Sequence, residues 1–159
     1  MRTAEQLRYL VLALQREGNR QLTSAFKSIN LTPSQAEVIR VVGEHGPLNL
    51  GRIGEVLICE SGGNPSRLVN RLVIDGLIER KTALGDRRNL QLSLTKAGYR
   101  SFDLVKEIEE QFYDEIEGDA SLRHVDLISG IDFLHAMIGG ASSGKALEKR
   151  IEMTKAASR

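Results

Sequence analysis

The sequence contains a single cysteine, Cys59, among its 159 residues. One cysteine excludes an internal disulfide framework, and it excludes a zinc site built from two or four cysteines of one chain. Long apolar runs are also absent, since the longest, Tyr9 to Leu14, is far shorter than the ~20 residues that span a bilayer. Because Glu5 and Arg8 interrupt any apolar N-terminal core, we expect no secretion signal and a cytoplasmic protein.

Motifs of common enzyme classes are missing as well. The sequence has no Gly-rich phosphate-binding loop, no nucleophile elbow and no His-Glu-x-x-His pair. We therefore predict neither a catalytic site nor a cofactor. Two acidic runs have the spacing of exposed helix faces rather than of a paired acid and base: Glu107, Glu109 and Glu110, and Asp114, Glu115 and Glu117.

Basic and acidic side chains are separated along the chain, although the formal net charge is only +1. Residues 61–100 carry eight basic and three acidic side chains, whereas residues 101–140 carry two basic and ten acidic ones. The basic middle predicts a face that attracts a polyanion, and chance clustering beside a solvated acidic helix is the alternative. With 41% apolar and 27% charged residues, the chain has the composition of one globular subunit, 1–159.

Apolar residues at helical spacing predict a long helix over about 4–29. A second helix begins with a strong signal, because Thr32 suits the N-cap, Pro33 suits the first helical position and Gln35 completes a capping box. We expect this second helix to end at Gly43.

A turn over 43–47 and a short strand over 48–50 should lead to a short third helix over 50–57. The pair Asn64-Pro65 repeats the helix-start signal, and the fourth helix should end near Gly76. One face of that fourth helix is apolar and the opposite face carries hydrogen-bonding side chains. The apolar stripe is Leu68, Val69, Leu72 and Val73, and the polar stripe is Ser66, Arg67, Asn70 and Arg71.

Two strands are predicted next, over 77–81 and over 90–94, where apolar and polar residues alternate. Gly85-Asp86 lies between them and marks the tip of a hairpin, with Arg87 and Arg88 beside it. The hairpin therefore forms a small β wing that carries basic side chains.

The remaining chain is predicted to be helical. Thr95 can cap a long helix that ends at Gly118, and another helix should open at Asp119 or Ser121 and run to about residue 138. Residues 141–159 are small and charged, and we expect a tail or a helical extension there.

This order of elements is the winged helix-turn-helix pattern, between about Leu48 and Thr95. A helix with one apolar face and one Asn/Arg/Ser face can lie in the ~12 Å major groove of DNA and present donors to base edges. A hairpin with arginine at its tip can reach the neighbouring minor groove. The free backbone N–H groups at the start of the helix can bind a phosphate.

Four stretches in a fixed order carry a family resemblance: Leu31-Thr-Pro-Ser-Gln35, Ser66-Arg-Leu-Val-Asn-Arg-Leu72, Gly76-Leu-Ile-Glu-Arg80, and Asp86-Arg-Arg88 followed by Leu92-Ser-Leu-Thr-Lys-Ala-Gly98. From about Leu31 to Gly98 the chain resembles the MarR (multiple antibiotic resistance regulator) family of bacterial transcription factors. The Asp-x-Arg wing followed by Leu-Thr-x-x-Gly is the most specific part.

The resemblance implies a mainly α fold with a small β wing: a winged helix-turn-helix region over 31–98, and dimerisation helices over 1–30 and 99–140. It implies a homodimer that binds double-stranded DNA at a pseudo-palindromic operator, usually as a repressor. Many such proteins release DNA when a small phenolic or other aromatic effector binds between the dimer helices and the winged region. The expected DNA-binding residues are Asn64, Ser66, Arg67, Asn70, Arg71, Asp86, Arg87 and Arg88, with Asp86 holding Arg88.

Two departures from the family pattern leave the start of the recognition helix open. The turn from Ile58 to Ser61 is about one residue longer than usual, and Gly51 and Gly54 each cost a short helix ~1 kcal/mol relative to alanine. The recognition helix could therefore begin at Ser61 or at Asn64.

Particular residues suggest alternative functions. Cys59 could make the protein a redox-responsive regulator, although family members that sense peroxide carry the reactive cysteine in the first helix, where this chain has none. His124 and His135 would lie ~16 Å apart along one helix, which is too far for one metal ion. A winged helix used only for protein contact is the last alternative, and it would not need arginine on both the recognition helix and the wing.

Overall fold

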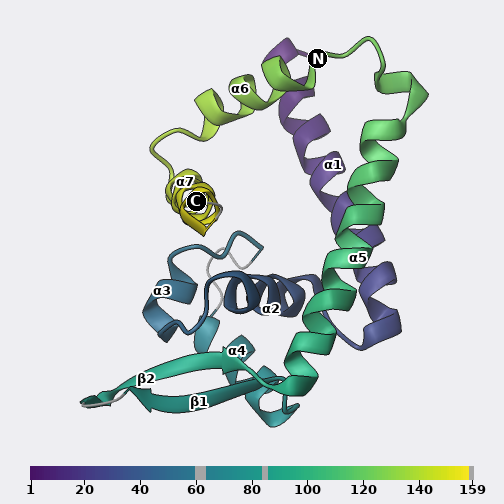
Figure 1. The fold of residues 1–159 in the computed structure, drawn as a ribbon. Coiled ribbons are helices and arrows are strands. Elements are labelled where there is room, and N and C mark those ends of the chain that lie inside the picture. Colours follow the sequence, from purple (N-terminus) through teal and green to yellow (C-terminus); the bar gives the residue numbers. More distant parts are fainter. Residues whose placement is uncertain (60–63, 84–85, 158–159) are drawn as a thin grey trace.

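A computed structural model describes residues 1–59, 64–83 and 86–157 of the chain. Two long helices, α1 (Thr3–Phe26) and α5 (Lys96–Gly118), lie side by side and extend away from the winged region at the base of the molecule (Figure 1). The fold is mainly helical with a two-stranded wing, which confirms the predicted fold class. No helix within the described ranges is long and apolar enough to cross a membrane.

Helix α2 (Pro33–His45) forms the centre of the hydrophobic core and contacts α4, α5, α7 and β2. The predicted capping box is present, because Thr32 Oγ1 accepts a hydrogen bond from Gln35 N at 3.3 Å and Gln35 Oε1 accepts one from Thr32 N at 2.9 Å. The predicted end at Gly43 is wrong: this glycine packs against the Phe102 ring where a Cβ would collide, so it permits a close contact rather than ending the helix.

The helix-turn-helix elements follow α2. Helix α3 (Leu50–Gly54) starts at the third residue of the predicted strand over 48–50, so only Leu48 pairs with the sheet, through an isolated bridge to Leu92. Helix α4 (Pro65–Ile74) corresponds to the predicted recognition helix and has Asn64 as its N-cap. Ser61, the other predicted start, lies outside the described residues.

The wing is an antiparallel pair of strands, β1 (Ile78–Ala83) and β2 (Asp86–Leu94), which project beyond the body of the molecule (Figure 1). Both strands are longer than the alternating pattern predicted, because pairing continues from Ile78 opposite Leu94 to Ala83 opposite Asp86. Asp86 is therefore the first residue of β2 rather than part of the turn.

The Leu-Thr-x-x-Gly motif joins the wing to α5. Thr95 caps the helix by accepting a hydrogen bond from Gly98 N at 3.0 Å, and its hydroxyl donates to Gly76 O at 2.6 Å. A Cβ on Gly98 would collide with the carbonyl oxygen of Leu77, so this position needs glycine. The motif therefore locks the first turn of α5 against the chain that leaves the recognition helix.

The predicted start of the last long helix is wrong. A short 3₁₀ helix, η2 (Ala120–Leu122), follows α5, and α6 (Leu127–Ile138) begins later because Asp126 accepts hydrogen bonds from Ile128 N at 3.0 Å and Ser129 N at 3.3 Å. His124 accordingly lies before α6 rather than on one helix with His135. Residues 142–157 form a further helix, α7 (Ser142–Ala157), which returns from α6 to lie beside α2 (Figure 1).

Candidate nucleic-acid interface

Helix α4 presents a polar face to solvent. Its opposite face is anchored by Val69 and Leu72, which are buried at 1% and 0% exposure and fix the rotation of the helix about its axis. Arg67, Asn70 and Arg71 are exposed on the outer side. The structure therefore brings these three side chains onto one accessible surface, and their contact with DNA stays a prediction.

The beginning of α4 is organised by Asn64. Its side-chain Oδ1 accepts a hydrogen bond from Ser66 N at 3.0 Å, and its backbone oxygen accepts one from Arg67 N at 2.8 Å. Pro65 has no N–H to satisfy and is already set in a helical φ. The first turn of α4, which carries the positive end of the helix dipole, thus lies next to Arg67. This arrangement favours the binding of a phosphate.

Arg71 forms an ion pair within the helix, with its Nε 3.0 Å from Asp75 Oδ2. Both side chains reach solvent, at 66% and 31% exposure. Exposed pairs of this kind contribute little to stability, so a phosphate could replace Asp75 as the partner of Arg71 at little cost.

Asn70 is bound by Arg80, a residue outside the predicted DNA-binding set. Arg80 of β1 donates a hydrogen bond from Nη2 to Asn70 Oδ1, and both side chains are exposed. Strand alternation places Arg80 on the same face of β1 as buried Ile78, but it does not indicate Asn70 as its partner. The wing and the recognition helix are thereby joined by a hydrogen bond at their outer surface.

The predicted wing residues Asp86, Arg87 and Arg88 all belong to β2. Their side chains lie outside what the structure describes, so the support of Arg88 by Asp86 stays a prediction. The register of the two strands shifts between Thr82 and Ala83, just before this basic segment.

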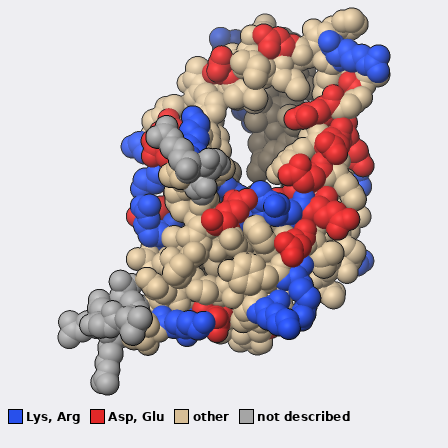
Figure 2. Space-filling model, in the orientation of Figure 1, with Lys and Arg blue, Asp and Glu red and all other residues tan. Residues whose placement is uncertain are grey.

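Charge is distributed along the molecule as the sequence indicated. Figure 2 shows Lys and Arg atoms at the base, over the winged region, and Asp and Glu atoms along the part of α5 that extends away from it. Exposed Lys96 and Arg100 lie at the start of α5, whereas exposed Glu107, Glu110 and Asp114 lie farther along. This distribution of charge attracts a polyanion to the winged region and repels it from the part of α5 that extends away from that region.

One member of the predicted exposed acidic runs is not exposed. The Glu109 side chain is only 15% exposed, and its Oε2 lies 3.2 Å from Arg40 Nε of α2. Burial raises the pKa of Glu109 although Arg40 opposes the shift. Glu109 is therefore part of the packing between α2 and α5, whereas its neighbours Glu107 and Glu110 are exposed.

A buried carboxylate supports the segment that leads to the recognition helix. Glu37 of α2 is 6% exposed and accepts hydrogen bonds from Ile58 N at 2.7 Å and Cys59 N at 2.9 Å. Arg150 of α7 completes its environment, with Nη1 2.6 Å from Glu37 Oε1. In the sequence, only its place between the apolar residues Ala36 and Val38 indicates that Glu37 is buried.

The surroundings of Cys59 disfavour its thiolate form. Part of the residue reaches solvent, but burial of the thiol and the nearby Glu37 carboxylate raise its pKa to about 11. A thiol with such a pKa is almost entirely protonated at neutral pH, whereas redox-sensing cysteines have lowered pKa values. The geometry therefore disfavours the redox-responsive alternative.

Comparison of the sequence with known proteins finds a matching family model and a related transcriptional regulator. A family model described as a winged helix DNA-binding domain matches residues 31–98. The organic hydroperoxide resistance transcriptional regulator of Bacillus subtilis is 32% identical over 98 residues, which are 62% of this chain and 66% of that protein.

Solved structures share the fold over most of the chain. A mutant of MarR from E. coli complexed with operator DNA has a TM-score of 0.69 at 19% identity, over 84% of this chain and 93% of that one. The organohalide-sensing RdhR transcriptional regulator in its 2,4-dichlorophenol-bound form has a TM-score of 0.74 at 17% identity, over 89% of this chain and 83% of that one. At these identities the two structures establish the fold alone.

Because its pKa is raised, we predict that Cys59 reacts slowly with thiol reagents at neutral pH. Because the thiolate is the attacking species, native Cys59 should react with an aromatic disulfide reagent about tenfold more slowly at pH 7 than the same thiol in the urea-unfolded chain. The rate should keep rising as the pH approaches about 11. Stopped-flow absorbance measures both rates, with Cys59→Ser as the blank. A native rate that equals or exceeds the unfolded one, or that levels off near pH 8, would contradict the prediction and revive the redox alternative.

Proposed function

Because the chain belongs to the MarR family of winged-helix transcriptional regulators, we propose that it binds double-stranded DNA sequence-specifically as a homodimer and represses transcription until a small aromatic effector binds. The family consists of transcription regulators rather than enzymes. The observation that carries the proposal is the exposed Arg67, Asn70 and Arg71 face of α4, set beside a projecting basic wing. We assign 31–98 to DNA binding, and 1–30 and 99–140 to dimerisation.

In this proposal α4 enters the major groove and the wing reaches the adjacent minor groove. Asn64 and Ser66 place the start of α4 against a phosphate, while the three exposed side chains of the helix face base edges and backbone. Selection of bound duplexes from a random pool would define the operator. Gel shifts at two salt concentrations separate a DNA-binding protein, which loses affinity steeply with salt, from a winged helix used only for protein contact.

We predict that Arg88 reads the minor groove and that Asp86 supports it. Arg88→Ala should weaken operator binding by ~1–3 kcal/mol and lower the salt slope by about one per wing. Asp86→Ala should also weaken binding, though less, because Asp86 restricts the arginine rotamers through a charge-assisted hydrogen bond. Fluorescence anisotropy across a salt series measures both effects.

Arg20→Ala is the matched control, since it removes a positive charge from α1 where Arg20 pairs with Glu17. It should leave the salt slope unchanged. If Asp86→Ala instead tightens operator binding, Asp86 merely repels phosphate and positions nothing.

Exposed apolar surface supports the dimer. Helix α6 is predominantly apolar yet has no buried residue, and Ile128, Ile131 and Met137 are 69%, 51% and 56% exposed. Helix α1 adds Leu10 and Leu14 at 59% and 72% exposure. Apolar side chains that gather at the surface mark interaction sites, so we propose that a second copy of the chain covers these helices.

The expected mass in solution is twice that of one chain. Ile131→Asp should shift the protein toward monomer or toward an unfolded chain, because it places a charge in the proposed interface. Ile74→Asp, at an exposed apolar position on α4 with 78% exposure, should leave the mass unchanged. Sedimentation at micromolar concentration distinguishes the species, and a monomeric mass for the unaltered protein would refute the dimer.

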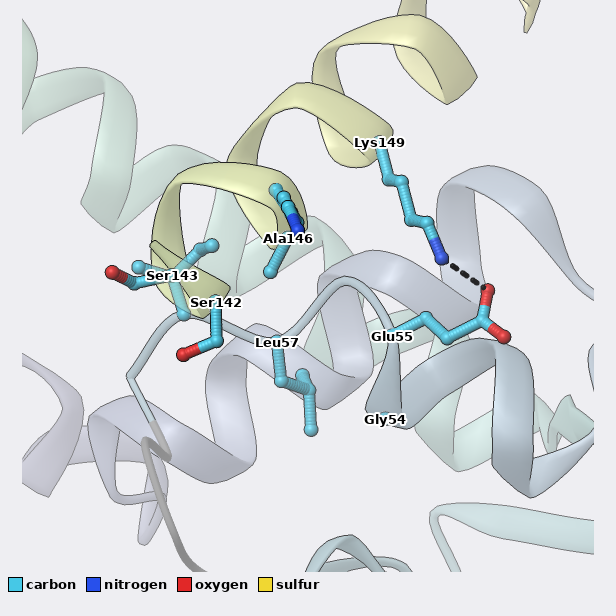
Figure 3. A pocket seen from close by; sticks show the side chains of 9 residues that line it. Gly54, Glu55, Leu57, Ser142, Ser143, Ala146 and Lys149 are labelled. Carbon is cyan, nitrogen blue, oxygen red and sulfur yellow. Dashed lines mark hydrogen bonds and ion pairs between the residues drawn. The ribbon is translucent and has the colours of Figure 1, made fainter. Parts of the chain in front are cut away.

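The candidate effector site is a cleft between the winged region and α7, which differs from the predicted place between the winged region and the dimerisation helices. Its volume is about 350 Å³; Leu57, Ile58 and Ala146 supply apolar surface, and Lys149 Nζ bridges its edge to Glu55 Oε2 at 3.2 Å (Figure 3). A ligand there would touch the segment that Glu37 holds in front of α4. It would lower DNA affinity only as far as it prefers the DNA-free geometry.

We therefore predict that a phenolic ligand such as 2,4-dichlorophenol weakens operator binding by this protein. Ala146→Phe, which fills the cleft, should abolish the response, whereas Ala156→Phe on the exposed end of α7 should not. Titration of ligand into a protein–operator complex measures the shift. Binding of the ligand without any change in operator affinity would show that the site is not allosteric.

A further inference from the structure

The contact between Arg80 and Asn70 lies where the wing meets the recognition helix. Both side chains line one cleft of about 360 Å³ at the outer surface, together with Ser66 of α4 and Leu90 of β2. Arg80 comes from β1, opposite Leu92, and reaches Asn70 Oδ1 through Nη2. A residue of the wing thus sets the orientation of a side chain on the helix that is proposed to read DNA.

The chemistry of the pair settles which way the Asn70 amide points. A guanidinium has only donors, so the atom of Asn70 that faces Arg80 must be the carbonyl oxygen. The amide nitrogen, with its two hydrogens, is then the end of Asn70 that remains for another partner. The pair therefore offers hydrogen-bond donors: the Asn70 amide and the remaining N–H groups of Arg80.

This orientation changes what asparagine can recognise. An unrestrained asparagine reads adenine with two hydrogen bonds, accepting from N6 at its oxygen and donating to N7 from its nitrogen. In this protein Asn70 Oδ1 already accepts a hydrogen bond from Arg80. The N6 group of adenine would therefore have to displace Arg80 or share Asn70 Oδ1 with it. Guanine presents two acceptors, O6 and N7, which match a surface that offers only donors.

We propose that Arg80 is a positioning residue that makes Asn70 a donor-only reader and so directs the recognition helix toward guanine rather than adenine at one operator position. The inference rests on the proposed function, because it concerns the base preference of a DNA-binding surface. It assigns to a wing residue a role in the major groove, separate from the minor-groove role of Arg88.

The first experiment finds the position that Asn70 reads. Duplexes are selected from a random pool by the full-length protein and by Asn70→Ala, and the base position whose preference disappears is the Asn70-dependent position. Two operators that differ only there, with G·C or A·T, then serve as probes. Binding of both is measured by anisotropy at fixed salt, so that the readout is the ratio of two dissociation constants rather than affinity itself.

The unaltered protein should bind the guanine operator about tenfold more tightly than the adenine operator. Arg80→Ala frees Asn70 Oδ1 and should bring this ratio to about one or reverse it. Asn70→Asp keeps an acceptor for Arg80 but lacks the amide donors, and it should also lose the guanine preference. Lys81→Ala is the control, since Lys81 is the next wing cation and pairs with Glu79 at 2.6 Å. It should weaken both complexes equally and leave the ratio unchanged.

The outcomes separate the inference from the function on which it rests. No salt-sensitive binding to any selected duplex would overturn both. Sequence-specific binding without an Asn70-dependent position, or with adenine preferred there, would overturn the inference alone. The same holds if Arg80→Ala keeps the guanine preference while Asn70→Ala abolishes it, because Arg80 would then couple wing to helix without affecting the base that is read.

Discussion

The arrangement of the DNA-binding end depends on the hydrogen bonds and the ion pair of Glu37, whose carboxylate is buried within α2. A buried charge is tolerated only when it is paired and hydrogen-bonded, and this one is satisfied by the backbone N–H groups of Ile58 and Cys59 and by Arg150. Removing a partner of such a pair typically costs ~3–5 kcal/mol. The carboxylate therefore holds the chain in front of the recognition helix and fastens α7 to the core.

Helix α4 is held from two directions. On the inner side, Val69 and Leu72 set its rotation, and Glu37 binds the backbone of Ile58 and Cys59 farther back along the chain. On the outer side, Arg80 of the wing fixes the amide of Asn70. The cleft beside Leu57 and Ile58 opens onto the inner support, so a ligand in the cleft and a base in the major groove would act on the same helix through separate contacts.

Local signals predicted the parts of the fold that depend on neighbouring residues. The capping box of Thr32 and Gln35 and the N-caps Asn64 and Thr95 appear where the sequence placed them, because a cap is made by side chains within three residues of the helix start. The same kind of reasoning failed after α5. Several residues there could cap a helix, and only the geometry shows Asp126 accepting from two backbone N–H groups of α6.

The sequence by itself determined the fold class, the order of the winged elements, the polar face of the recognition helix and the family. Each of these follows from short-range periodicity, helix caps and motif spacing. The tertiary structure alone decided the partners that are distant along the chain. Glu37 meets Arg150 across 113 residues, and Asn70 of α4 meets Arg80 of β1 across the turn that joins the helix to the strand. Such pairs follow from how helices and strands pack in space, and a linear pattern of residues does not encode which side chains that packing brings within hydrogen-bonding distance.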